Sequence, residues 1–154
     1  MKLKKICVIH LNQIGDLVFS LPLLRALKEN YPGVKIHSII RPYLQELLIN
    51  SPYIDELIYR KNGFRNKLKL LKKIRQNRYD LLITLSGSEE CLFLATFSRA
   101  RFKVGFASFP WDFSLDIKEK IEGHPSWYNN LKLLKQLKVN VEKKGLRQSY
   151  HPSA

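Results

Sequence analysis

Short apolar runs rich in Val, Ile and Leu recur along this chain, and each is followed by a segment with helical spacing. The first run, KKICVIHL at residues 4–11, precedes a stretch from about residue 16 to 30 whose leucines share one helical face, namely Leu17, Leu21, Leu24 and Leu27. Strands that are apolar on both faces belong in a parallel sheet covered on both sides. The alternation therefore predicts an α/β fold, a Rossmann-like open parallel sheet with helices on both faces.

The same pattern predicts the remaining elements. Strands are expected at 34–40, 54–59, 79–85 and 102–105, and helices from 41 to about 50, at 64–77, from 89 to about 98 and at 126–137. Pro22 predicts a kink or an irregular first turn in the first helix, whereas Pro42 suits a first helical position. No sustained period is found between 106 and 123. Residues 1–142 are expected to form one domain, and residues 143–154 a linker or frayed tail.

The strongest compositional feature is positive charge: 27 Lys and Arg against 13 Asp and Glu give a formal charge of +14 over 154 residues. Such a field attracts phosphates, anionic sugars, anionic membrane surfaces or nucleic acid. The basic tract at 60–78 predicts an amphipathic helix whose apolar stripe holds Phe64, Leu68, Leu71 and Arg75, with Leu70 and Ile74 beside it. Its Lys/Arg face is either a solvated surface or a means of orienting the protein at an anionic membrane. Nucleic acid is disfavoured, since aromatic residues are not interleaved with the basic run.

Cysteine usage argues against a metal site. Cys7 and Cys91 lie far apart, and neither has a neighbouring Cys or His at metal-ligand spacing. Both are expected to be buried free thiols, which suits a reducing cytoplasm. No apolar run reaches the roughly 20 residues needed to cross a bilayer.

Gly15 and Asp16 follow the first strand, at the edge where open parallel sheets bind ligands. The loops at 12–15, 41, 60–64 and 86–88 should surround the same crevice. A carboxylate at Asp16 could cap the following helix or face the crevice, and the spacing leaves both interpretations open. A single glycine between strand and helix excludes the G-x-G-x-x-G dinucleotide fingerprint, and there is no P-loop.

Several segments, in this order, resemble glycosyltransferase family 9, which contains the ADP-heptose:lipopolysaccharide heptosyltransferases. They are Gly15-Asp16, LPLLRAL at 21–27, Tyr31-Pro32, SPYID at 51–55, YDLLI at 79–83, RFKVGF at 101–106 and, after His124, NLKLL at 130–134. The likeness covers roughly residues 1–140. It implies one lobe of a GT-B type glycosyltransferase, the acceptor-side lobe, with the carboxyl-terminal donor lobe absent.

The resemblance also implies site residues. Asp16 would be the general base that activates an acceptor hydroxyl for attack on ADP-heptose or another nucleotide-sugar, with no metal and no further cofactor. Acceptor-binding positions would be His10, Asn12, Gln13, Gly15, Arg60, Lys61 and His124. The family commonly has Arg or Lys where this chain has His10, and small hydroxyl residues where it has Asn12 and Gln13. This departure leaves room for an acceptor other than the standard lipopolysaccharide inner core.

The expected function is therefore that of a heptosyltransferase-like lobe that is incomplete without a donor lobe. Its expected location is the cytoplasm, where peripheral association with the inner face of the inner membrane is a further expectation. Its expected substrates are a nucleotide-sugar donor and an acidic lipopolysaccharide-core glycolipid. Two alternatives stay open. One is a basic, non-catalytic module that binds anionic membrane or nucleic acid. The other is an inactive, truncated remnant of a longer enzyme.

Overall fold

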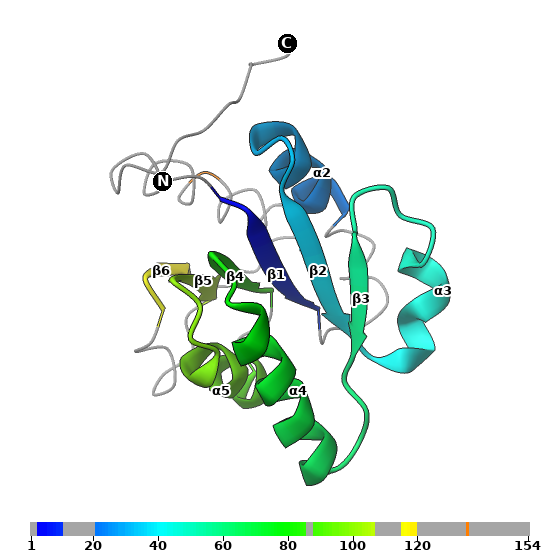
Figure 1. Ribbon diagram of the computed structural model, residues 1–154, viewed down its shortest axis with the longest axis vertical. Helices are drawn as coiled ribbons and strands as arrows, with labels where there is room; N and C mark the ends of the chain where they lie inside the picture. The colour runs from blue at the N-terminus through cyan, green and yellow to red at the C-terminus, as the bar shows by residue number, and fades with distance from the viewer. Residues whose placement is uncertain (1–2, 11–20, 86–87, 107–114, 120–134, 136–154) are drawn as a thin grey trace.

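The fold is built on one sheet of parallel strands (Figure 1), as seen in a computed structural model that describes residues 3–10, 21–85, 88–106, 115–119 and 135. The strands are β1 (Lys5–His10), β2 (Lys35–Ile40), β3 (Glu56–Tyr59), β4 (Leu81–Thr84), β5 (Phe102–Phe106) and β6 (Ile117–Glu119). All five neighbouring pairs are parallel, and their order is β3-β2-β1-β4-β5-β6. This is the order of doubly wound, Rossmann-like sheets, so the predicted fold class is confirmed.

Helices cover both faces of this sheet. They are α2 (Leu21–Asn30), the 3₁₀ turn η1 (Pro42–Leu44), α3 (Gln45–Leu48), α4 (Phe64–Asn77) and α5 (Glu89–Phe97). Successive side chains of a strand point to opposite faces. Ile6 and Val8 accordingly join the core cluster under α2, whereas Cys7 and Ile9 join the cluster under α4 and α5. The central strand β1 is therefore apolar on both faces, as the first apolar run predicted.

Most predicted elements are confirmed with small shifts at their ends. Helix α4 begins and ends where it was predicted, Pro42 opens the 3₁₀ turn, and both cysteines are buried free thiols. Strand β6 was missed. It is only three residues long, and its place is fixed by distant contacts: the Asp116 amide donates to the Lys103 carbonyl at 2.7 Å, and the Lys103 amide donates to the Asp116 carboxylate at 2.8 Å. Of the helix predicted at 126–137 only residue 135 is described, and the predicted tail lies outside the described residues.

The predicted apolar stripe of α4 was partly wrong. Leu70, Leu71 and Ile74 are buried, but Phe64 is 70% exposed and Leu68 is 44% exposed. A helix of 14 residues is about 21 Å long, whereas a strand of four residues spans only about 13 Å. The first turns of α4 therefore extend past the strands that the helix covers, as its lower end in Figure 1 shows.

Among the described helices, none has the length and apolarity to cross a bilayer. Within the same residues, no group of three or more His, Cys, Asp or Glu side chains could hold a metal ion.

Candidate functional site

The strand register brings two arginines side by side at the carboxyl edge of the sheet. Ile40, the last residue of β2, pairs with Tyr59, the last residue of β3, so the residues that follow them, Arg41 and Arg60, are neighbours. The backbone continues this pairing, because the Arg60 amide donates to the Ile40 carbonyl at 2.8 Å. On the other side of β2, Ile40 pairs with His10, the last residue of β1. The strand order reverses between the neighbouring strands β1 and β4, because β2 and β3 lie on one side of β1 and β4 to β6 on the other. Open parallel sheets bind ligands beside such a point.

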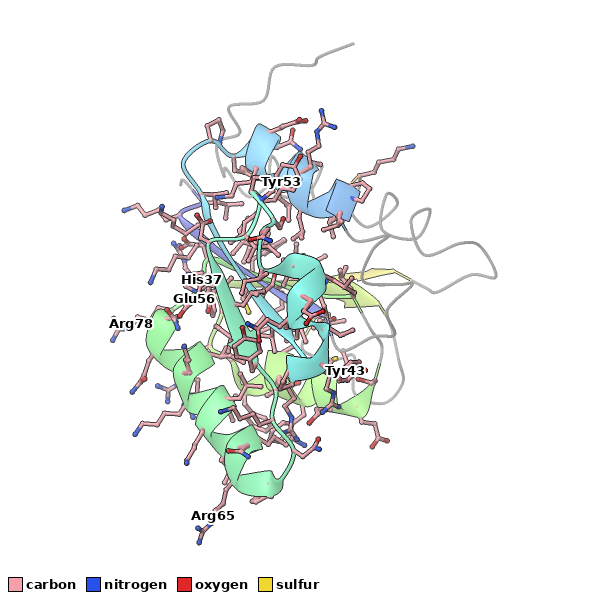
Figure 2. All side chains as sticks on the ribbon, turned by 90° about the vertical axis from the view of Figure 1, so that its right-hand side faces the viewer. His37, Tyr43, Tyr53, Glu56, Arg65 and Arg78 are labelled. Atoms are coloured by element: carbon pink, nitrogen blue, oxygen red, sulfur yellow. The ribbon has the colours of Figure 1, made fainter. Side chains whose placement is uncertain are left out.

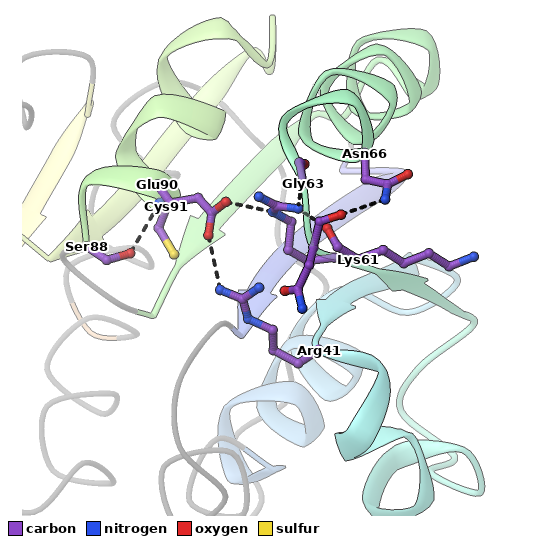
Figure 3. A network of polar contacts seen from close by, with 9 residues as sticks. Arg41, Lys61, Gly63, Asn66, Ser88, Glu90 and Cys91 are labelled. Carbon is purple, nitrogen blue, oxygen red and sulfur yellow. Dashed lines mark hydrogen bonds and ion pairs between the residues drawn. The ribbon is translucent and has the colours of Figure 1, made fainter.

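A carboxylate from α5 holds both guanidinium groups (Figure 3). Arg60 Nε donates to Glu90 Oε1 at 2.6 Å, and Arg41 Nη2 donates to Glu90 Oε2 at 3.3 Å. Glu90 lies in the first turn of α5, where the helix dipole favours a negative charge. That turn is capped by Ser88, whose hydroxyl accepts from the Cys91 amide at 3.3 Å. We refer to Arg41, Arg60 and Glu90 as the edge cluster.

The two arginines of the edge cluster differ in exposure and in the number of hydrogen bonds that they donate. The Arg60 side chain is only 9% exposed, and its Nη1 also donates to the carbonyls of Lys61 and Gly63. The Arg41 side chain is 30% exposed, and among the described residues its ion pair is with Glu90. One carboxylate against two guanidinium groups leaves a net positive charge, which the exposed Lys61 increases. The edge can therefore attract an anion, with Arg60 as the scaffold and Arg41 and Lys61 as the accessible cations.

His10 contributes a neutral side chain to this edge. It is 1% exposed, and its Nε2 lies 3.3 Å from the Ser38 hydroxyl on the neighbouring strand. Burial lowers the pKa of His10 to about 3, so the imidazole carries no charge at neutral pH. His10 can therefore orient a polar group by hydrogen bonding, but it does not add to the positive charge of the edge.

On the β4 side, Thr84 and Gly105 pack directly against each other. Thr84 is fully buried, and among the described residues its hydroxyl has no hydrogen-bond partner. A Cβ added to Gly105 would overlap that hydroxyl and also crowd the Thr84 carbonyl at 3.2 Å. Position 105 thus requires glycine because β5 approaches the end of β4 closely.

Of the predicted site residues, the structure brings His10, Arg60 and Lys61 to one edge. Gly15, Asp16, Asn12, Gln13 and His124 lie outside the described residues, and their assigned roles stay predictions. Glu90 was not predicted at this edge, and Arg41 was placed beside the crevice without a role in the site. Arg41 had a signal, since it directly follows a predicted strand; Glu90 had none, because its partners lie 30 and 49 residues away in sequence.

The chain is similar to heptosyltransferases in both sequence and structure. No family model matches it. It is 28% identical over 152 residues to lipopolysaccharide heptosyltransferase 3 of Escherichia coli, a match that covers 91% of this chain and 45% of that protein. A glycosyl transferase of family 9 from Veillonella parvula superposes with a TM-score of 0.77 and 26% identity, covering 89% of this chain and 42% of the other. The predicted resemblance to glycosyltransferase family 9 is confirmed.

A third comparison concerns the fold alone. The E. coli heptosyltransferase WaaC, solved with ADP, superposes with a TM-score of 0.70 at 12% identity, covering 97% of this chain and 50% of that one. The described sheet accordingly has the fold of one lobe of a GT-B type glycosyltransferase. The chain spans less than half the length of the curated relatives that it matches.

Proposed function

We propose that this chain is the acceptor-side lobe, residues 1–142, of a heptosyltransferase-type glycosyltransferase. It holds an acidic lipopolysaccharide-core acceptor while a donor lobe supplies heptose, or a related sugar, from an ADP-sugar. The observation that carries the proposal is the edge cluster, a net positive group at the carboxyl ends of β2 and β3 beside the point where the strand order reverses. The similarity to heptosyltransferases supports the same substrate classes.

Asp16 is the base in this proposal. As the acceptor hydroxyl oxygen attacks the anomeric carbon of the ADP-sugar, the Asp16 carboxylate takes the hydroxyl proton and ADP leaves from the opposite face with inversion. Asp16 follows β1 in sequence, and residues 6–10 of that strand are all buried; a base held after such a strand would have a rigid support. No metal or further cofactor takes part in this scheme.

The described cations bind the acceptor rather than react. Arg41 and Lys61 are accessible and positive, so they pair with carboxylate or phosphate groups of the acidic core. Arg60 acts through Glu90, which fixes the Arg41 guanidinium toward the edge. His10, neutral and buried, orients a polar group at the end of β1. Asn12, Gln13, Gly15 and His124 complete the proposed acceptor contacts.

The reaction takes place in the cytoplasm, and the lobe works close to an anionic membrane surface, where a glycolipid acceptor would be displayed. The net charge of +14 supports both the acidic acceptor and the anionic surface.

The proposal is tested by reconstitution. The chain is mixed with ADP-heptose, an acidic lipopolysaccharide-core acceptor and the donor lobe of a family 9 heptosyltransferase, and the glycosylated acceptor is measured by mass spectrometry. We expect transfer with wild type and a loss of at least about 100-fold with Asp16→Asn, the magnitude typical of a missing general base. Equal transfer by both proteins would refute the assigned base.

Acceptor binding is measured separately, without a donor lobe. We expect Arg41→Gln to weaken acceptor binding about tenfold, the effect of one charge-assisted hydrogen bond. The control is Arg25→Gln, which removes an exposed arginine of α2 that pairs with Glu29. Equal binding by the two variants would show that the edge cluster is not the acceptor site.

A further inference from the structure

A second concentration of cations lies between α4 and the segment that follows α5, at the opposite edge of the sheet. A groove of about 900 Å³ is lined there by Lys72, Arg75, Arg78, Arg99 and Arg101. Arg78 precedes β4 and Arg101 precedes β5, so this α4–α5 groove opens at the amino ends of these strands. Strands of four to six residues separate it from the edge cluster by about 13–20 Å. A ligand in this groove would not occupy the proposed acceptor site.

The positive charge of the groove is largely unbalanced. Asp80 is 3.7 Å from Arg101, and its other oxygen already accepts from the amides of Lys4 and Lys5 at 2.9 and 3.1 Å. In the part of the chain that the structure describes, the other four cations of the groove have no carboxylate within 4.0 Å. A concave surface with several cations and one shared carboxylate attracts anions.

The backbone holds two of these arginines in a fixed arrangement. Arg78 and Arg99 both adopt left-handed conformations, with φ of 49° and 60°; Arg78 directly follows α4, and Arg99 follows Ser98, the residue after α5. The turn at Arg99 is built by the buried Ser98, whose hydroxyl donates to the Ala95 carbonyl at 2.7 Å and accepts from the Ala100 amide at 3.2 Å. Glycine is the residue that usually occupies such positions without steric cost. Arginine at both sites is unfavourable for the backbone but adds two guanidinium groups to the same groove.

Stabilisation of helix ends accounts for only part of this arrangement. A cation after a helix interacts favourably with the negative end of its dipole, which would explain Arg78 and Arg99. The helix dipole does not explain Arg101, which directly precedes β5, or Lys72, which lies more than a turn before the end of α4. The groove also has an apolar floor, because Leu68 is 44% exposed and Leu71 lies beside it.

We propose that the α4–α5 groove is a binding site for a phosphate group carried on a ligand with an apolar portion. Guanidinium forks match phosphate oxygens in pairs, so Arg78, Arg99 and Arg101 would bind the phosphate. The apolar portion of the ligand would rest on Leu68 and Leu71. Two sources share this chemistry, a phospholipid headgroup at a membrane surface and a free phosphorylated compound in solution. The site does not depend on the proposed sugar transfer.

Two probes separate the sources. Inorganic pyrophosphate is titrated by calorimetry in low-salt buffer, and binding to vesicles of phosphatidylcholine with 30% phosphatidylglycerol is measured by sedimentation. About one anionic lipid in three gives the vesicles a negative surface, to which basic side chains are attracted. Arg78→Gln with Arg99→Gln is compared with the control pair Arg65→Gln with Lys69→Gln, which removes the same charge from α4 outside the groove. Arg65 lies at the opposite end of α4 from Arg78, as Figure 2 shows.

We expect the groove pair to weaken binding of at least one probe by about tenfold or more, and the control pair by no more than about twofold. Binding of pyrophosphate identifies a soluble phosphorylated ligand, and binding of vesicles alone identifies a lipid headgroup. Equal losses in the two pairs, or no binding of either probe to wild type at low salt, would overturn the proposal.

A second variant separates binding from folding. In Arg78→Gly with Arg99→Gly both left-handed positions receive the residue that fits them, so the melting temperature should be equal to or above that of wild type. Binding should still fall by about tenfold or more, because both guanidinium groups are gone. A glycine pair that binds like wild type would show that these arginines do not hold the phosphate.

Discussion

Removing the negative charge of Glu90 tests whether the edge cluster is a buried ion pair or an incidental surface contact. In Glu90→Gln, Arg60 keeps its charge but loses its counter-ion, and its side chain is only 9% exposed. A hydrogen bond to a charged group contributes about 1.5–3 kcal/mol, and the half-exposed Arg41 contact adds about 0.5 kcal/mol. Since the glutamine amide oxygen still accepts one hydrogen bond, we expect a net loss of about 2 kcal/mol in the free energy of unfolding.

The chain offers a matched control for this experiment. Arg25 and Glu29 form an ion pair of 2.9 Å within α2, but their side chains are 64% and 49% exposed. Exposed pairs spaced i, i+4 on a helix contribute about 0.3–0.5 kcal/mol, so Glu29→Gln should cost no more than that. Both variants are unfolded in urea at pH 7 and at two salt concentrations. Salt should weaken the effect of Glu29→Gln more than that of Glu90→Gln, because buried charges are screened less.

Equal losses in the free energy of unfolding from Glu90→Gln and Glu29→Gln would refute a buried ion pair in the edge cluster. In that case the short distance between Arg60 and Glu90 would carry no more energy than a surface contact, and Arg60 could not be the rigid scaffold for Arg41. A further variant, Arg60→Met with Glu90→Leu, removes both charges. We expect it to be closer to wild type than Glu90→Gln, because an unpaired buried charge costs more than an absent pair.

Three further predictions concern stability. Because burial lowers the folded-state pKa of His10 to about 3, the unfolded chain takes up a proton below about pH 6.5 while the folded chain does not. The contribution of neutral His10 to stability is therefore present above about pH 6.5 and is lost as the pH falls towards 3. Between pH 7 and pH 5, the free energy of unfolding in urea should fall by about 2 kcal/mol more in wild type than in His10→Gln. Equal losses in the two proteins would contradict the lowered pKa. Gly105→Ala should cost about 1–3 kcal/mol through overlap with Thr84, and combining it with Thr84→Ala should recover part of the loss in a double-mutant cycle. Ser98→Ala should cost about 1–2 kcal/mol, since it leaves the buried Ala100 amide without its acceptor; a melting temperature equal to that of wild type would contradict this.

The sequence predicted elements well where the signal was local. Helix α4 was placed at both ends because Gly63 precedes its apolar period and a new apolar run follows Arg78. Which residues of α4 are buried could not be predicted in the same way. The apolar period of the sequence shows which side chains share one face of α4. How much of that face is buried depends on the length of the strands beneath it, which are shorter than the helix. Phe64 is thus apolar in sequence and exposed in the structure.

The candidate site shows the same division between local and distant signals. Arg60 and Lys61 were predicted from their position after a strand, and the register confirms that they lie at the carboxyl edge. That Arg60 is a scaffold follows only from Glu90, which is 30 residues further along the chain and reaches it through the packing of α5. The charge balance at a site therefore depends on tertiary contacts, and it could not be predicted from the sequence of the loop alone.

The strand order has a consequence for how the protein can fold during synthesis. Strand β1 is central, yet its partner β4 begins at residue 81, some 75 residues after the Lys5 carbonyl that accepts from the Asp80 amide. β2, which ends at residue 40, emerges first and can pair with β1 on one side only. At roughly 5–20 residues per second, the other side of β1 waits about 2–8 s for β4. During that time β1, a strand with apolar side chains on both faces, has an open edge, the kind of surface that joins strands of other chains. The ribosome-bound chain is thus most vulnerable to aggregation after β2 and before β4.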